Sequence, residues 1–276
     1  MPEPRLAPIL CDLDGVVWLS HEPIAGSVEA IAALRSAGHR VLFVTNNSYA
    51  KVAQQEETLN SIGIPAVGDV LTSSGAAATL LKSGQRVLVA GGPGVVEAVE
   101  SVGAIVAGRT DDDSSPEAQA ESDSEIDAVI VGFHRTFDFE SMRRASAAVR
   151  AGATLIGTND DATYPTSSGV IPGGGSILAA IATASGVAPI IAGKPFAPMG
   201  ELVRRALNTH DLSSCWMVGD RYSTDGVFAK TIGAKFALAS SGVIDRAGAN
   251  TLQSEHKFEL VVEDLAGLAK HLGIAI

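Results

Sequence analysis

The chain has 276 residues, of which 46% are hydrophobic and 18% charged, and this composition excludes an intrinsically disordered protein. Its formal net charge of −11 disfavours general binding to nucleic-acid backbones or anionic membranes, and two cysteines are too few for a disulfide scaffold. Most of the negative charge lies between residues 109 and 127, where eight acidic residues accompany one arginine. This stretch is predicted to be a solvated, mobile loop.

The sequence shows no targeting or membrane segment. No apolar stretch reaches the roughly 18 residues of a membrane span, and the N-terminus lacks a basic region followed by an apolar run. We therefore expect a cytoplasmic protein with free thiols at Cys11 and Cys215.

Short apolar runs alternate with helical stretches along the chain, which predicts an α/β protein with a largely parallel sheet. The expected strands are residues 8–13, 40–45, 70–72, 86–90, 104–106, 128–132, 154–158, 214–219 and 235–239. The expected helices are residues 27–37, 49–62, 75–83, 94–102, 139–151, 176–185, 198–207, 224–232 and 265–272. Residues 177–192 are expected to form a short helix, a turn and a strand.

Two carboxylates follow the first expected strand, at Asp12 and Asp14. Ligands of doubly wound sheets bind at the carboxyl ends of strands, and alternate residues of a strand point to the same side. The two side chains could therefore converge on one site. A turn stabilised by Asx hydrogen bonds is the alternative explanation.

Small polar residues follow the second expected strand, in the run Thr45-Asn46-Asn47-Ser48. A hydroxyl, side-chain amides and backbone N–H groups at a helix start can bind an anion. The same run could also be an ordinary helix N-cap.

Two later turns carry further charged groups. Lys194 lies between a glycine and a proline, which would hold it on a stiff, close-packed turn. A surface lysine is the usual alternative explanation for such a residue. Asp220 follows the apolar run that ends at Gly219, and Asp225 comes five residues later. Hard oxygen ligands brought together from several strand ends suit Mg²⁺.

Taken in order, the motifs D-L-D-G-V, V-T-N-N-S, G-K-P and V-G-D-R-x-x-T-D resemble those of the haloacid dehalogenase-like phosphatases. The chain looks most like the p-nitrophenylphosphatase-like branch, in which a large α/β cap is inserted between the second and third motifs. The resemblance spans nearly the whole chain and includes the cap motifs at residues 158–161, 164–165 and 172–176. It implies a doubly wound, Rossmann-like parallel-sheet core.

The resemblance also implies roles for the motif residues. Asp12 would be the nucleophile that forms an aspartyl-phosphate, and Asp14 the general acid and then the general base. Lys194 would neutralise charge beside the phosphate. The residues implied to bind the transferring phosphoryl group are Thr45, Asn46 and Asn47.

The resemblance implies Mg²⁺ as the cofactor. The ion would be held by the carboxylates of Asp12 and Asp220 and by the backbone carbonyl of Asp14, with Asp225 supporting the site.

The motif residues and the resemblance together predict how the chain divides into domains. Residues 1–81 and 190–276 would form a discontinuous core, because Asp12, Thr45, Lys194 and Asp220 are expected at one shared sheet edge. Residues 82–189 would form the cap, which selects the leaving group. The cap residues expected near the site are Asn159, Asp161 and Tyr164.

The expected activity is hydrolysis of a small phosphorylated metabolite, whose identity the sequence leaves open, and the resemblance also allows a homodimer. Phosphoryl transfer, as in a mutase, and a non-catalytic ligand-binding protein of the same fold are the alternatives. The glycine-rich turn at residues 91–94 suggests dinucleotide binding, but the position of the third glycine is Glu97 and no suitably placed acid follows. The run Gly173-Gly174-Gly175 is expected to be a tight turn before a helix.

Overall fold

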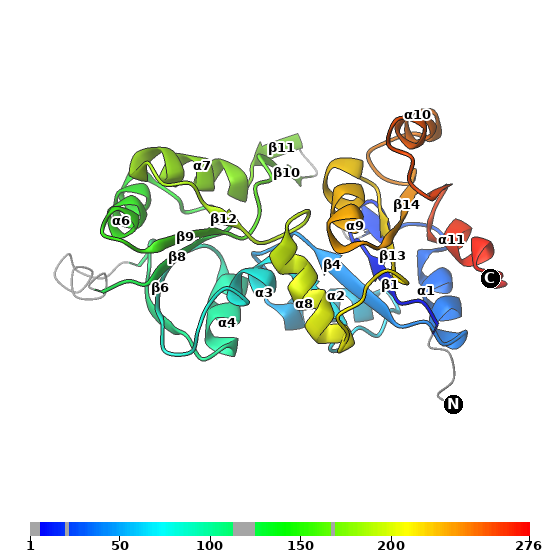
Figure 1. The fold of residues 1–276 in the computed structure, drawn as a ribbon, viewed down its shortest axis with the longest axis horizontal. Helices are drawn as coiled ribbons and strands as arrows, with labels where there is room; N and C mark the ends of the chain where they lie inside the picture. The colour runs from blue at the N-terminus through cyan, green and yellow to red at the C-terminus, as the bar shows by residue number, and fades with distance from the viewer. Residues whose placement is uncertain (1–5, 20–21, 113–124, 167–168) are drawn as a thin grey trace. The chain divides into compact units, whose positions relative to one another are not determined.

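A computed structural model describes residues 6–19, 22–112, 125–166 and 169–276, so most of the predicted acidic loop lies outside the described residues. The protein has the predicted α/β architecture, and its main strands form two separate sheets (Figure 1). The chain divides into two compact units. The first comprises Met1–Thr45, Ala53–Leu71 and Val203–Ile276, and the second comprises Asn46–Val52 and Thr72–Leu202.

The sheet of the first unit has the strand order β15-β14-β13-β1-β4-β5. Its central strand β1 is completely buried and pairs in parallel with β13 on one side and β4 on the other. A parallel sheet covered on both faces requires such continuous apolar runs. Its strands are β1 (Ile9–Cys11), β4 (Val41–Thr45), β5 (Val70–Thr72), β13 (Trp216–Gly219), β14 (Lys235–Ala239) and β15 (Leu260–Val262).

Helices cover this first sheet. Helix α1 packs on α11, and α9 packs on β14. A small hairpin of β2 (Trp18–Leu19) and β3 (Glu22–Pro23) follows β1. The helices are α1 (Ser27–Ser36), α2 (Val52–Ser61), α9 (Val227–Ile232), α10 (Arg246–His256) and α11 (Leu265–His271), with a π-helical turn at Tyr222–Gly226.

The sheet of the second unit has the order β12-β9-β8-β6-β7, and each neighbouring pair of these strands is parallel. Figure 1 shows α6 and α7 together on one face of this sheet and α4 on the other. The strands are β6 (Arg86–Ala90), β7 (Ile105–Arg109), β8 (Ala128–Val131), β9 (Thr154–Gly157) and β12 (Ile190–Ile191). The helices are α3 (Ser73–Ala78), α4 (Pro93–Ser101), α6 (Phe139–Arg150), α7 (Gly174–Ser185) and α8 (Ala197–Leu207), which ends in the first unit.

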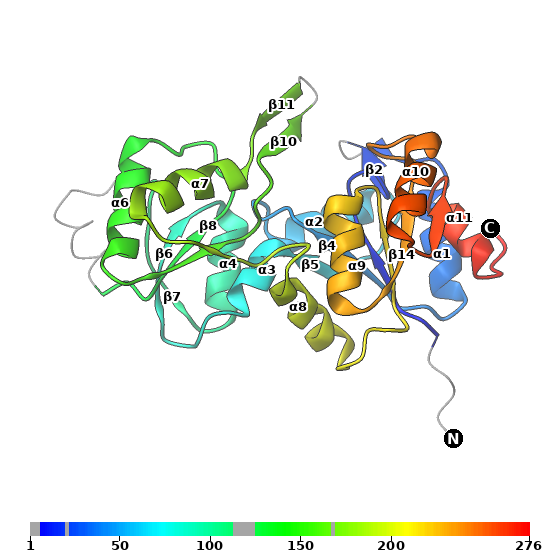
Figure 2. The ribbon, with the colours of Figure 1, turned by 45° about the horizontal axis from the view of Figure 1, so that its top comes forward.

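An antiparallel hairpin also belongs to the second unit. It consists of β10 (Thr163–Thr166) and β11 (Gly169–Pro172), and Figure 2 shows it extending beyond the start of α7. The sequence pattern did not predict this hairpin, because each of its strands contains a proline.

The bounds of the two units differ from the predicted domain division in three segments, residues 46–52, 72–81 and 190–202, all of which fall in the second unit. Strand β12 pairs with β9 of the second sheet, and Ala192 and Gly193 continue that ladder by donating to the carbonyl oxygens of Gly157 and Thr158. Residues 46–52 join the second unit because they contact the start of α4, where the Val52 N–H donates to the Glu97 carboxylate at 2.8 Å. Hydrogen bonds between segments far apart in the chain, which the sequence pattern does not reveal, thus tie these residues to the second unit.

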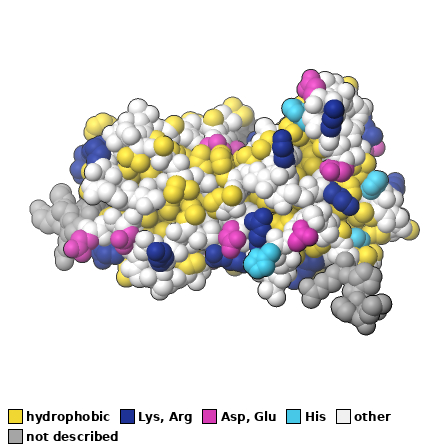
Figure 3. Space-filling model, viewed as in Figure 1, with side chains coloured by type: hydrophobic (Ala, Val, Ile, Leu, Met, Phe, Trp, Pro, Cys, Tyr) yellow, Lys and Arg dark blue, Asp and Glu magenta, His cyan; other side chains and the backbone are white. Residues whose placement is uncertain are grey.

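The distribution of surface side chains and the lengths of the helices indicate which kinds of partner the protein could bind. On the face shown in Figure 3, Lys and Arg side chains are dispersed among acidic ones, and apolar side chains gather over α7 and β12. Among the helices of the described residues, none has the length and apolar character to cross a membrane.

Candidate active site

Three carboxylates lie together at the carboxyl edge of the first sheet. One oxygen from each of Asp12, Asp220 and Asp225 lies within 4.8 Å of the others. Asp12 follows β1 and Asp220 follows β13, and the Asp12 N–H donates to the Val218 carbonyl at 2.9 Å. Buried Thr45 ends β4, on the other side of β1. Adjacent parallel strands therefore carry Asp12, Thr45 and Asp220 to one edge.

The two later carboxylates are buried and fixed by the backbone. Asp220 is 5% exposed and accepts the Val243 N–H at 3.0 Å, whereas Asp225 is completely buried and accepts the Arg221 N–H at 3.2 Å. A Cβ atom on Gly15 would lie 2.2 Å from Asp220 Oδ2, and one on Gly242 would lie 2.1 Å from it. Only glycine at both positions allows the chain to pass this close to the carboxylate.

The chemistry of this cluster fits a divalent cation. Three carboxylates, two of them buried, would repel one another without a nearby positive charge. Oxygen-only ligands suit Mg²⁺, which keeps part of its water shell for a substrate phosphate. Asp225 contributes its carboxylate to the cluster directly.

Asp14 has a different environment. Its carboxylate is not part of the cluster found among the described residues, and its Oδ1 accepts a 3.1 Å hydrogen bond from Trp18 Nε1. Asp14 is exposed, whereas Trp18 is only 3% exposed. The motif pattern predicts no role for Trp18, although its spacing of four residues from Asp14 within one tight turn is visible in the sequence.

In the second unit, the side chain of Asn46 binds the backbone on both sides of Lys194. Asn46 Oδ1 accepts the Lys194 N–H at 2.8 Å, and Asn46 Nδ2 donates to the Lys194 carbonyl at 3.0 Å. Nδ2 also donates to Asp161 Oδ2 at 3.0 Å. Both amide protons of Asn46 are therefore used within the second unit, where its side chain holds the backbone of Lys194. Contact of Asn46 with a phosphoryl group stays a prediction.

The backbone of Asn46 is held as well. Its carbonyl accepts hydrogen bonds from Asn159 Nδ2 at 2.8 Å and from Ser73 Oγ at 2.7 Å. Asn159 Oδ1 in turn accepts the Asp161 N–H at 3.2 Å. Asn159 is 6% exposed, so it supports the loop rather than lining an open surface. We call Asn46, Ser73, Asn159, Asp161 and Lys194 the amide network.

Lys194 follows β12 of the second sheet, and not a strand of the first sheet as predicted. Its side chain is among the largest fully buried ones, with 2% exposure. Gly193 allows the close approach, since a Cβ there would lie 2.6 Å from Asn46 Oδ1. Asn47 is partly buried, and its Oδ1 accepts the Tyr49 N–H at 3.0 Å.

The ring of Tyr164 is held by stacking. It lies on β10 and stacks on Phe133 with a centroid distance of 5.0 Å and an interplanar angle of 10°. Phe133 also contacts the ring of Tyr49 edge-on at 5.9 Å. Tyr164 is partly buried, so its ring is fixed and part of its surface is accessible.

Two glycine-rich turns of the second unit accommodate backbone rather than a ligand. A Cβ on Gly92 would lie 2.4 Å from the Tyr49 ring, and one on Gly94 would lie 2.3 Å from the Ala50 carbonyl oxygen. The space that a dinucleotide would need beside this turn is therefore filled by chain. Similarly, Gly173 and Gly175 begin α7 against the carbonyls of Asp161 and Asp160.

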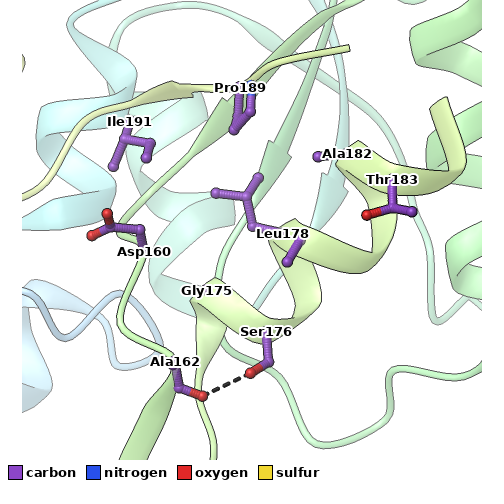
Figure 4. A pocket seen from close by; sticks show the side chains of 10 residues that line it. Asp160, Ala162, Gly175, Ser176, Leu178, Ala182, Thr183, Pro189 and Ile191 are labelled. Atoms are coloured by element: carbon purple, nitrogen blue, oxygen red, sulfur yellow. Dashed lines mark hydrogen bonds between the residues drawn. The ribbon is translucent and has the colours of Figure 1, made fainter. Parts of the chain in front are cut away.

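A shallow groove of about 500 Å³ lies between α7 and the segment that leads into β12 (Figure 4). Its lining is mostly apolar, and its one charged residue is Asp160. Burial and the neighbouring Asp161 charge raise the pKa of Asp160. A groove lined by a carboxylate and no cation does not suit a phosphate ester.

Comparisons with known proteins agree with these motifs. Residues 9–105 match a model of haloacid dehalogenase-like hydrolases, and residues 191–268 match a second HAD-hydrolase-like model. The chain is 36% identical to D-glycerol 3-phosphate phosphatase of Mycobacterium tuberculosis over 85% of its length, and it spans 63% of that relative.

Solved structures show the same fold. A p-nitrophenyl phosphatase from Archaeoglobus fulgidus has a TM-score of 0.84 and 27% identity, with 97% of this chain and 100% of that chain covered. A glycerol phosphate phosphatase from M. tuberculosis, solved in complex with magnesium, has a TM-score of 0.81 and 30% identity, with 96% and 76% covered. The resemblance inferred from the four motifs is confirmed.

Proposed function

Because the chain belongs to the haloacid dehalogenase-like hydrolase family, we propose that it is a Mg²⁺-dependent phosphatase of small phosphate monoesters. The observation that carries this proposal is the group of three carboxylates, Asp12, Asp220 and Asp225, at the carboxyl edge of the first sheet. The named relatives described above are phosphatases, and one of them was solved with magnesium.

The proposed reaction has two steps. An Asp12 carboxylate oxygen bonds to phosphorus while the bond from phosphorus to the ester oxygen breaks, and Asp14 gives its proton to that oxygen. Water then attacks phosphorus and gives a proton to Asp14, and the bond from phosphorus to Asp12 breaks. Inorganic phosphate leaves, and both side chains return to their starting states.

The other residues would supply charge and hydrogen bonds. Thr45 would donate to the phosphoryl group, Lys194 would neutralise its charge, and Asn46 would hold Lys194 in place. Mg²⁺, when held by Asp12, Asp220 and Asp225, would add positive charge beside the phosphoryl oxygens. Such charge matters because phosphoryl transfer depends mainly on positioning and electrostatic stabilisation.

We also propose that the second unit acts as the cap that selects the leaving group. Tyr164 presents part of a fixed aromatic ring, which suits contact with a leaving group better than with phosphate. Replacing Tyr164 with Ala should then change kcat/KM for a bulky ester and a small ester by different factors. A small phosphorylated metabolite as the substrate, a cytoplasmic location and a homodimer remain predictions from the sequence.

Release of inorganic phosphate tests the proposed function. Glycerol 3-phosphate and p-nitrophenyl phosphate should both be hydrolysed in the presence of Mg²⁺, and EDTA should stop the reaction. A mutase would instead return a phosphorylated product, and a non-catalytic protein would turn over neither ester. Titration calorimetry with Mg²⁺ alone, on wild type and on Asp220→Asn, would measure the metal site independently of turnover.

A further inference from the structure

A buried indole donates a hydrogen bond to the carboxylate that we propose as the general acid. Trp18 Nε1 lies 3.1 Å from Asp14 Oδ1, a normal distance for a bond to a carboxylate. Trp18 is 3% exposed, whereas Asp14 is exposed. The fixed partner in this pair is therefore the tryptophan.

Backbone hydrogen bonds fix the positions of Asp14 and Trp18 within the turn. The Gly15 N–H donates to the Trp18 carbonyl at 2.8 Å, and the Trp18 N–H donates to the Leu13 carbonyl at 3.2 Å. The Gly15 carbonyl accepts the Ser241 hydroxyl at 2.8 Å. Trp18 also begins β2, which pairs with β3. The indole N–H is thus presented to Asp14 by a turn anchored at several points.

The indole group can only donate a hydrogen bond. In a neutral carboxyl group the oxygen without the proton is the better acceptor, so the indole favours the form in which Oδ2 carries the proton. Fixing Oδ1 also fixes the plane of the carboxyl group, and with it the direction of Oδ2. From this geometry we propose that Trp18 is a positioning residue, which orients Asp14 so that Oδ2 delivers the proton to the leaving group.

This inference rests on the proposed phosphatase function and concerns the step in which the ester oxygen needs a proton. An alkoxide such as that of glycerol leaves poorly without one, whereas p-nitrophenolate leaves readily as an anion. General acid catalysis contributes about 10²–10⁴-fold, and misorientation of the acid should remove part of it. The effect of Trp18 should therefore depend on the leaving group.

The first test is Trp18→Phe, which keeps an aromatic ring and removes the N–H. We expect kcat for glycerol 3-phosphate to fall about tenfold to a hundredfold, whereas kcat for p-nitrophenyl phosphate changes less than about threefold. KM should stay the same for both esters. The matched control is Trp216→Phe, since Trp216 is similarly buried at the opposite end of β13 from Asp220. It should leave the ratio of the two rates unchanged.

The second test does not replace Trp18. The chain has two tryptophans, so its ¹⁵N–¹H spectrum should show two indole signals. In Asp14→Ala, the Trp18 indole proton should shift upfield and exchange faster with water, while the Trp216 signal stays in place. An unshifted Trp18 signal, or an equal loss of both rates in Trp18→Phe, would overturn the proposal. Wild-type protein that hydrolyses neither ester would instead refute the phosphatase function itself.

Discussion

The carboxylate cluster of the first unit and the amide network of the second are built by different means. Strand ends bring Asp12 and Asp220 together, and glycines at positions 15 and 242 let the chain close around Asp220. In the amide network, the neutral side chain of Asn46 binds the backbone of a segment 148 residues away. The carboxylates are thus placed by the sheet, whereas Lys194 is placed by the hydrogen bonds of Asn46. Substitutions in the carboxylate cluster and in the amide network should therefore have different effects on activity and stability.

The largest expected effect comes from Asp12→Asn, which should lower kcat at least about a thousandfold, because an amide is a poor nucleophile at phosphorus. The substitution is nearly isosteric, so the melting temperature should stay close to that of wild type. Phosphate release and thermal unfolding are the two measurements. Turnover near the wild-type rate would rule out the covalent mechanism.

Next in size is Gly15→Ala, compared with Gly68→Ala. Gly15 and Gly68 have nearly equal positive φ angles, 81° and 78°, so an added side chain should cost each about 1 kcal/mol of backbone strain. Only at position 15 would the new Cβ meet Asp220, because a Cβ at position 68 would have nothing within 4 Å.

Gly15→Ala should therefore raise the Mg²⁺ concentration needed for half-maximal activity, while Gly68→Ala lowers stability alone. Activity against Mg²⁺ concentration, measured for both variants, separates the two effects. If both variants needed the same Mg²⁺ concentration, a Cβ at position 15 would not displace the Asp220 carboxylate, which would contradict the prediction.

A third prediction concerns the amide network. Asn46→Asp keeps the acceptor for the Lys194 N–H and removes both donors, which leaves the Lys194 carbonyl without Nδ2 and sets two carboxylates against each other at Asp161. Loss of these hydrogen bonds should lower the free energy of unfolding by about 1–3 kcal/mol.

Adding Asp161→Asn exchanges the donor and acceptor of one bond and should restore part of that stability. Chemical denaturation of the single and double variants measures the difference. If the double variant is no more stable than Asn46→Asp, then the bond between Asn46 and Asp161 contributes little.

The smallest effect should come from His134 in the second unit. Burial lowers the pKa of His134 below its usual value of 6.5, Nδ1 hydrogen-bonds to Thr136 at 3.3 Å, and the buried Nε2 has no hydrogen-bond partner in the described part of the chain. Because the folded pKa is the lower one, His134 favours folding fully above pH 6.5, and this contribution is lost as pH falls through the folded pKa.

His134→Gln should therefore flatten the decline in melting temperature between about pH 7 and pH 5. The exposed His210→Gln serves as the control and should follow the wild-type curve. If the melting temperature of His134→Gln fell with pH as steeply as that of wild type, other groups would cause the acid sensitivity.

The carboxylate cluster could be predicted from the sequence because each member follows an apolar strand within a few residues. The amide network could not, because its bonds join residues far apart and involve side chains with no local pattern. Lys194 was expected at the edge of the first sheet because it was grouped with Asp12, Thr45 and Asp220. The two-residue strand β12 gives almost no pattern that could have assigned it to another sheet.

Other elements escaped prediction for equally local reasons. Helix α10 has only one buried residue, Ala249, so an apolar period is nearly absent. Strand β15 is three residues long. The burial that stabilises both comes from their neighbours in the first unit and not from their own composition.

The order of strands along the chain has a consequence for synthesis on the ribosome. Strand β1 gains its neighbour β4 early, but its other neighbour, β13, ends only at Gly219, and β15 ends at Val262. The second sheet, by contrast, is complete in sequence at Ile191. Domains fold as units during translation. We therefore expect the second unit to become structured first. At that stage β13, β14 and β15, which are half of the sheet that contains β1, have not yet left the exit tunnel.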